Sequence, residues 1–232
     1  MSSGFFAFFA HTGFLTVLED EGLLPSRVSG SSAGALVGAA WAGGLDAPLL
    51  ARELIQLERR HFWDPAPGPG LLRGRLFRER LEAILPRRQF AACRVPAAVS
   101  VFDVLTRKTR VVESGDLPCA IHASCAVPLL FHPVRVDGRA SLDGGILDRP
   151  GLAGMPASEA RVLYHHIASK SPWRAKQDVP ARRGAVTLML EGLPRSGPFD
   201  LEAGRRAFAA ARDATKRALD RPVGAGLVVE AA

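Results

Sequence analysis

The chain has 232 residues, 47% of them hydrophobic and 23% charged, a composition that fits a folded globular protein and excludes disordered and fibrous chains. Its 30 basic and 23 acidic residues give a net charge of +7, but no base-reading module accompanies this charge, so we expect no nucleic acid partner. The three cysteines include no C-x-x-C pair, which argues against a disulfide scaffold and a zinc site, and no metal ion or cofactor is indicated.

The apolar run near the N-terminus, residues 5–18, has no basic segment before it and is followed by three acidic residues, unlike a secretory signal. The longest uncharged run, residues 28–45, is interrupted by Gly and Ser and predicts no membrane span. We therefore expect a cytoplasmic protein. Residues 59–94 hold nine Arg against three acidic residues, which predicts either a solvated face or peripheral contact with an anionic membrane surface. The oligomeric state is unknown at this stage.

The first half of the chain contains alternating helix and strand signals. Apolar spacing predicts helices over 9–21, 35–42, 48–60 and 75–85, and a strand over 23–29. Three prolines within residues 64–70 forbid regular structure there. We therefore interpret residues 46–92 as a helical, Pro/Gly-containing and flap-like segment over a site.

The second half continues the alternation. It predicts hairpins over 95–112 and 134–142, a helix over 117–126, strands over 162–168 and 186–191, and an amphipathic helix over 200–219. Strands alternating with helices predict an α/β fold of three layers, α/β/α, with a mainly parallel central sheet. We expect one domain over residues 1–232.

The strongest local signal for chemistry is the G-x-S-x-G sequence Gly30-Ser31-Ser32-Ala33-Gly34, which lies between a predicted strand and a predicted helix. A nucleophilic serine on so sharp a turn needs small residues on either side, because strand and helix must come close together. The helix that starts after Ser32 directs free N–H groups toward a developing oxyanion. The alternative is a glycine-rich turn that only caps a buried helix.

A serine nucleophile needs a base, and the sequence offers Asp143 and six histidines. Asp143 precedes Gly144 and Gly145 at the end of a predicted strand, where nothing obstructs its carboxylate. The alternative for this segment is an ordinary Asp-Gly turn. None of the histidines has an evident catalytic role; they are His11, His61, His122, His132, His165 and His166.

Together these motifs resemble the patatin-like phospholipase family. The similarity also includes the predicted first helix (13–22), the elbow and its helix (27–41), the segment 123–131 and Asp143-Gly144-Gly145-Ile146-Leu147-Asp148-Arg149-Pro150. The resemblance covers residues 4–155. It implies the family's fold and a Ser32–Asp143 dyad without a catalytic histidine, acting on phospholipid or lysophospholipid, with simpler carboxyl esters next.

One segment departs from the family pattern. The glycine-rich oxyanion loop, G-G-G-x-[KR]-G, corresponds here to Ser3-Gly4-Phe5-Phe6-Ala7-Phe8, which keeps one glycine and no basic residue. We expect backbone N–H groups of Gly4, Phe5 and Ala33 to form the oxyanion hole. Only three residues precede Gly4, so either the sheet lacks the family's first strand or the chain begins upstream.

The phenylalanines next to this loop, Phe5, Phe6, Phe8 and Phe9, are candidates for an acyl groove or for the core at the start of a helix. The rival to an acyl ester hydrolase is a non-catalytic protein that binds lipid or a membrane surface, with an impaired oxyanion loop.

Overall fold

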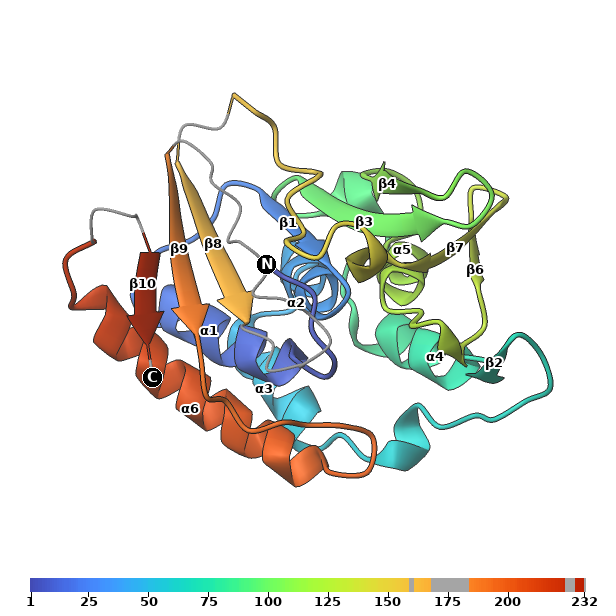
Figure 1. The fold of residues 1–232 in the computed structure, drawn as a ribbon, viewed down its shortest axis with the longest axis horizontal. Coiled ribbons are helices and arrows are strands. Elements are labelled where there is room, and N and C mark those ends of the chain that lie inside the picture. The colour runs from blue at the N-terminus through green and yellow to red at the C-terminus, as the bar shows by residue number, and fades with distance from the viewer. Residues whose placement is uncertain (159–160, 168–183, 224–227, 232) are drawn as a thin grey trace.

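Helices and strands alternate through most of the computed structural model, which describes residues 1–158, 161–167, 184–223 and 228–231 (Figure 1). The helices are α1 (Phe8–Asp20), α2 (Ala33–Ala42), α3 (Ala47–Ile55), α4 (Arg75–Ile84), α5 (Leu117–Ser124) and α6 (Leu201–Leu219). The strands are β1 (Val28–Ser31), β2 (Gly70–Leu72), β3 (Ala97–Asp103), β4 (Lys108–Val112), β5 (Leu129–Phe131), β6 (Val134–Val136), β7 (Arg139–Asp143), β8 (Val162–Ile167), β9 (Ala185–Leu190) and β10 (Val228–Ala231).

Both catalytic candidates lie at the ends of strands that pair with β3 in a five-stranded sheet, because Ser32 follows β1 and Asp143 ends β7. The order is β1-β3-β7-β6, with β4 also paired to β3. Ser31, the last residue of β1, pairs with Ser100 of β3, and Asp143, the last residue of β7, pairs with Val101. Ser100 and Val101 are adjacent in β3, so β1 and β7 end next to each other. The segments that follow these two strands therefore lie side by side.

A second sheet has the order β10-β9-β8, and all its pairings are parallel. Between the two sheets lie residues 1–3, near the position marked N in Figure 1. The N–H of Ser31 donates to the carbonyl of Met1 at 3.4 Å, and the N–H of Ser2 donates to the carbonyl of His165 at 3.1 Å. The described residues before α1 contain no regular strand, yet this short segment is hydrogen-bonded to both sheets.

The predicted α/β class is confirmed, and four of the seven pairings between the described strands are parallel. In the five-stranded sheet the pairing of β1 with β3 is parallel and the other three are antiparallel. Helix α1 contacts α2, α3 and α6. Its residues from Phe9 to Leu18 are all buried, including the polar His11, Thr12 and Thr16, because other elements surround the helix. Helices α2 and α5 pack against β3.

The predicted helices and both hairpins are found, with shifted ends. The helix expected over 48–60 stops at Ile55; the side chains of Glu58 and His61 then cap a separate 3₁₀ turn, Arg59–His61. The strand expected over 23–29 begins only at Val28, because Pro25 lacks an N–H and residues 21–24 are exposed. The strand expected over 162–168 is β8; Ala168 lies outside the described residues.

Candidate active site

Ser32 lies on the sharp turn between β1 and α2. Its φ of 52° and ψ of −120° are unusual for a residue with a side chain. A Cβ on Gly30 would lie 2.5 Å from the carbonyl carbon of Gly34, and a Cβ on Gly34 would lie 2.3 Å from the carbonyl oxygen of Met1. Both glycines of the motif are therefore needed for the close approach of strand, helix and N-terminal segment.

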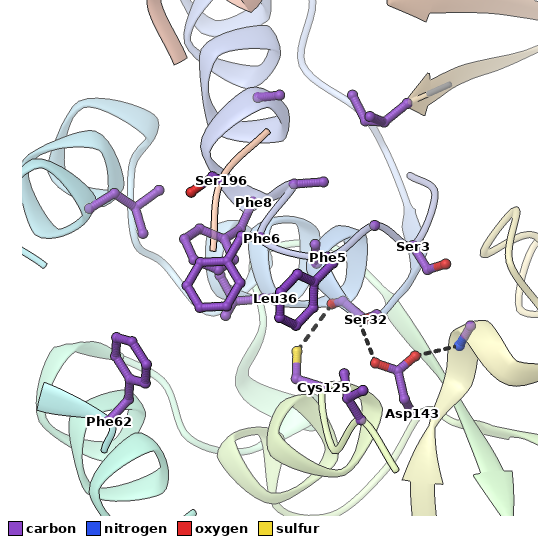
Figure 2. Close-up of a pocket in the computed structure, with 18 of the residues that line it drawn as sticks. Ser3, Phe5, Phe6, Phe8, Ser32, Leu36, Phe62, Cys125, Asp143 and Ser196 are labelled. Atoms are coloured by element: carbon purple, nitrogen blue, oxygen red, sulfur yellow. Dashed lines mark hydrogen bonds between the residues drawn. The ribbon is translucent and has the colours of Figure 1, made fainter. Parts of the chain in front are cut away.

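Residues of α5 and its end hold the peptide groups of Ser32. The N–H of Ser32 donates to Oγ of Ser124 at 2.8 Å, and the Ser124 hydroxyl donates to the carbonyl of Ser100 at 2.7 Å. The thiol of Cys125 donates to the carbonyl of Ser32 at 3.3 Å (Figure 2). Sequence reasoning missed Ser124 as a site residue, although it lies within the segment 123–131 that resembles the family.

The structure brings Ser32 and Asp143 together. The hydroxyl of Ser32 donates to Oδ2 of Asp143 at 2.6 Å, and the N–H of Gly145 donates to Oδ1 at 2.7 Å (Figure 2). Both residues are buried, with 8% and 6% of their surface exposed. A Cβ on Gly144 would lie 2.1 Å from the carbonyl oxygen of Ser100, so the turn after Asp143 needs this glycine.

None of the six histidines, all of which lie in the described part of the chain, hydrogen-bonds to Ser32. His61 alone among them lines the cavity described below. His165 and His166 both lie buried in β8, where burial lowers the pKa of His165 well below its usual value and that of His166 to about 4. The only base in hydrogen-bond contact with the Ser32 hydroxyl is thus a carboxylate.

Gly4, Phe5 and Ala33, the expected oxyanion-hole residues, line the same cavity as Ser32. Within the described residues, no acceptor is hydrogen-bonded to the N–H groups of these three. Ala33 is the first residue of α2, so its N–H lies at the positive end of the helix dipole. Free donors on two sides of Ser32 suit an anion formed at that point.

The cavity beside Ser32 has a volume of about 660 Å³. Phe5, Phe6 and Phe8 lie together on one side of Ser32 (Figure 2), whereas Phe9 is packed in the core. Apolar side chains from α2, α3, α4 and neighbouring segments complete much of the wall: Leu36, Leu50, Leu54, Leu57, Phe62, Phe77, Leu81, Ile84, Val127 and Leu130. The wall of the cavity is therefore mainly apolar.

Residues of the 46–92 segment, on α3, α4 and the turn between them, thus form one wall of the cavity. A salt bridge between Glu53 of α3 and Arg80 of α4 joins the two helices at this wall. That the segment 46–92 as a whole covers the site stays a prediction, as does its movement as a flap.

Cys125 places a thiol on the cavity wall. Burial, together with the carboxylate of Asp143, raises the pKa of its thiol well above the usual value. The neutral thiol is a weak nucleophile, and in this position it serves as a hydrogen-bond donor to Ser32.

In the part of the chain that the structure describes, no group of three or more His, Cys, Asp or Glu side chains is arranged to hold a metal ion. Over the same residues, none of the helices combines the length and the apolar character that a bilayer-spanning segment needs.

The sequence is similar to a known family and to several known proteins. The sequence model of the patatin-like phospholipase family matches residues 1–156. Uncharacterized NTE family proteins of Mycobacterium bovis and Mycobacterium tuberculosis are 33% identical over 205 residues, which cover 85% of this chain and 56% of each relative. The chain therefore spans little more than half the length of these curated relatives.

Among solved structures, VipD from Legionella pneumophila superposes with a TM-score of 0.68 at 15% sequence identity, covering 94% of this chain and 66% of VipD. At this identity the likeness concerns the fold.

Proposed function

The chain belongs to the patatin-like phospholipase family, and we propose that it is a lipid acyl hydrolase that uses Ser32 and Asp143 as a catalytic dyad. The observation that carries this proposal is the 2.6 Å hydrogen bond from the Ser32 hydroxyl to the Asp143 carboxylate. General-base catalysis requires such contact between nucleophile and base. The apolar cavity around the pair supports an acyl ester as substrate.

The proposed reaction has two halves. Oγ of Ser32 attacks the ester carbonyl carbon while its proton passes to Oδ2 of Asp143, and N–H groups of Gly4, Phe5 and Ala33 stabilise the oxyanion. The leaving alcohol takes the proton from Asp143 as the C–O bond breaks. Water then attacks the carbonyl carbon of the acyl-enzyme and gives a proton to Asp143. Asp143 passes this proton to Oγ of Ser32 as the bond between Oγ and the acyl group breaks and the fatty acid leaves.

A carboxylate with an ordinary pKa of about 3.9 is a weak base for a serine hydroxyl. The stabilisation of the oxyanion must therefore supply much of the rate enhancement. The unbonded donors on Gly4, Phe5 and Ala33 support this role, because a backbone N–H does not depend on which side chain the residue carries. The departure of this loop from the G-G-G-x-[KR]-G pattern therefore does not remove the backbone N–H donors that the proposal needs.

We infer a phospholipid or lysophospholipid as the substrate class, with simpler carboxyl esters next. The cavity of about 660 Å³ has the size of a site for a large apolar ligand. A series of p-nitrophenyl esters tests this, since an acyl groove makes kcat/KM rise with chain length. Equal rates for short and long chains would contradict the groove.

The loop that keeps only Gly4 of the family's glycines favours one rival, a lipid-binding protein without catalysis. A fluorophosphonate probe separates the two functions, because it modifies only an activated serine. We expect rapid labelling of the wild type, none of Ser32→Ala, and labelling and ester hydrolysis at least about 10²-fold slower in Asp143→Asn. Liposome binding by a wild type that the probe does not label would favour the rival.

A further inference from the structure

Large apolar side chains remain exposed around the opening of the cavity. Phe5 and Ile146 line the cavity and are themselves exposed. Leu129 is 84% exposed and lies between Pro128 and Leu130, which both line the cavity. We call the following five exposed residues the apolar rim: Phe5, Leu71, Leu129, Ile146 and Leu147.

The other two rim residues, Leu71 and Leu147, are neighbours of these residues in strand pairing and in sequence. Leu71 is the middle residue of β2, which pairs in parallel with β5, the strand that begins at Leu129. Leu147 follows Ile146 directly. Exposed apolar side chains thus come from four chain segments that line the cavity or pair with a strand that lines it, an arrangement that monomeric surfaces rarely keep without a partner.

Backbone strain marks the same region. Five residues other than glycine have positive φ in the described part of the chain. Arg107 and Asp137 lie in the turns of the two hairpins, where this conformation closes the loop. The others are Ser32, Phe6 and Leu129, of which the first two line the cavity and the third, with φ of 67°, belongs to the rim. A bulky side chain held in this conformation and exposed to water points to a role outside the fold.

The charges at the cavity favour an anionic partner. Asp143 belongs to the dyad, and Glu53 is paired with Arg80. The other fully charged side chains on the lining are Arg149 and Arg195. The exposed Arg73 directly follows β2, and the whole chain carries a net charge of +7. Arginines beside exposed leucines suit a surface with acyl chains below and anionic head groups above.

We propose that the apolar rim docks on the surface of an anionic lipid bilayer, with the rim side chains between the acyl chains and the nearby arginines at the head groups. An acyl chain then passes from the bilayer into the cavity without crossing water. This inference rests on the proposed acyl hydrolase function for its purpose. Its test is separate, because binding to vesicles is measured without turnover.

The test compares a variant with substitutions in the apolar rim with a variant substituted outside the rim. In a Ser32→Ala background, Leu71→Ser with Leu129→Ser removes two rim leucines, and Leu105→Ser removes a leucine that is 89% exposed in the β3–β4 turn. Flotation uses vesicles of equal parts phosphatidylcholine and phosphatidylglycerol. We expect the rim variant to lose vesicle binding by about tenfold or more, while Leu105→Ser binds like the Ser32→Ala parent. Added salt or vesicles of phosphatidylcholine alone should weaken binding by the parent.

Activity supplies the second readout, with the same leucine substitutions in a catalytic Ser32 background. We expect the rim variant to hydrolyse a soluble short-chain ester at the wild-type rate and vesicle phospholipid more slowly. If the parent and the rim variant float equally, or if neither floats, the inference is wrong. It is also wrong if the rim substitutions change the oligomeric mass of the protein and not its vesicle binding, since the rim then joins copies of the chain. Vesicle binding that depends on the rim, in a wild type without esterase activity, would support the inference and contradict the proposed function.

Discussion

At the scale of single residues, the orientation of Ser32 depends on a side chain 92 positions away in the sequence. The hydroxyl of Ser124 accepts the N–H of Ser32 and donates to the carbonyl of Ser100, and Ser124 is fully buried. Without this acceptor, the buried N–H of a residue with φ of 52° has no partner. Ser124 is therefore expected to hold the strained turn on which the nucleophile lies.

Ser124→Ala should lower kcat for a soluble ester by about tenfold to a hundredfold, which corresponds to the cost of one unsatisfied buried donor. The KM should change little, because Ser124 does not line the cavity. The rate of fluorophosphonate labelling should fall in parallel, and amide hydrogen exchange at Ser32, followed by NMR, should accelerate.

Ser29→Ala is the matched control, since Ser29 is also buried and also donates to a backbone carbonyl, that of Gly151, at 2.7 Å, without touching Ser32. Equal losses of kcat in both variants would mean that Ser124 acts only through general stability.

At the scale of elements, the contact between α1 and α6 depends on one glycine. A Cβ on Gly13 would lie 2.4 Å from the carbonyl oxygen of Phe208 and 3.1 Å from the backbone nitrogen of Arg212. Backbone atoms of a helix cannot move aside individually, so a methyl group must push the two helices apart.

Gly13→Ala should therefore lower the free energy of unfolding by about 1–3 kcal/mol. Gly38→Ala is the matched control in α2, because a Cβ there meets nothing closer than 3.6 Å. It should be neutral or stabilise by up to about 1 kcal/mol through helix propensity. Urea denaturation of both variants measures the difference, and equal midpoints would contradict the close contact.

The elements that the sequence predicts are those with a local signal. Helix α6 has a periodic apolar stripe, and the hairpin β3–β4 has runs of strand-forming residues on both sides of the turn at Arg107. Strands β2 and β5 have three residues each and form a two-stranded sheet with each other. They are too short to show a periodic hydrophobic pattern in the sequence. Their pairing depends on where α4 and α5 bring the chain.

The residues of the site also divide into those with a local sequence signal and those without one. Ser32 and Asp143 are predictable, because G-x-S-x-G and D-G-G restrict the backbone around them. Ser124 is not predictable from its own surroundings, because a serine at the end of a helix carries no pattern for its long-range partner. The positions of Gly4 and Phe5 depend on how residues 1–3 are held between the two sheets, which no motif of this chain encodes.

At the scale of the whole molecule, a buried pair of histidines joins the two sheets through the segment before Gly4. Nε2 of His11 lies 2.8 Å from the carbonyl oxygen of Ser2, so this nitrogen carries a proton and donates it. Nδ1 of His11 then accepts from Nδ1 of His165 at 2.8 Å. This arrangement requires a neutral His11 ring, and burial lowers the pKa of His11 to about 3 and that of His165 well below its usual value.

Neutral buried histidines make the stability depend on pH in a defined direction. In the unfolded chain a histidine binds a proton below about pH 6.5, whereas these folded rings stay neutral until their lowered pKa values are reached. The unfolded state thus binds more protons below pH 6.5, and the free energy of unfolding falls as the pH falls. Burial lowers the pKa of His122 and of His166 to about 4, so four histidines act in the same direction. Asp103 contributes only at more acidic pH, because the N–H of Thr106, with Arg139, lowers its pKa to about 2.

The free energy of unfolding should therefore fall as the pH drops from 6.5 to about 4, by up to about 1.4 kcal/mol per pH unit for each histidine. Urea midpoints measured at intervals across this range test the window. His122→Leu should reduce the slope by the share of one proton, because His122 packs against Phe77 and Phe131 and its buried Nε2 has no hydrogen-bond partner in the described residues. A wild-type curve that stays flat down to pH 4 would mean that the buried rings accept protons in the folded state, and that the junction between the sheets does not depend on a neutral histidine pair.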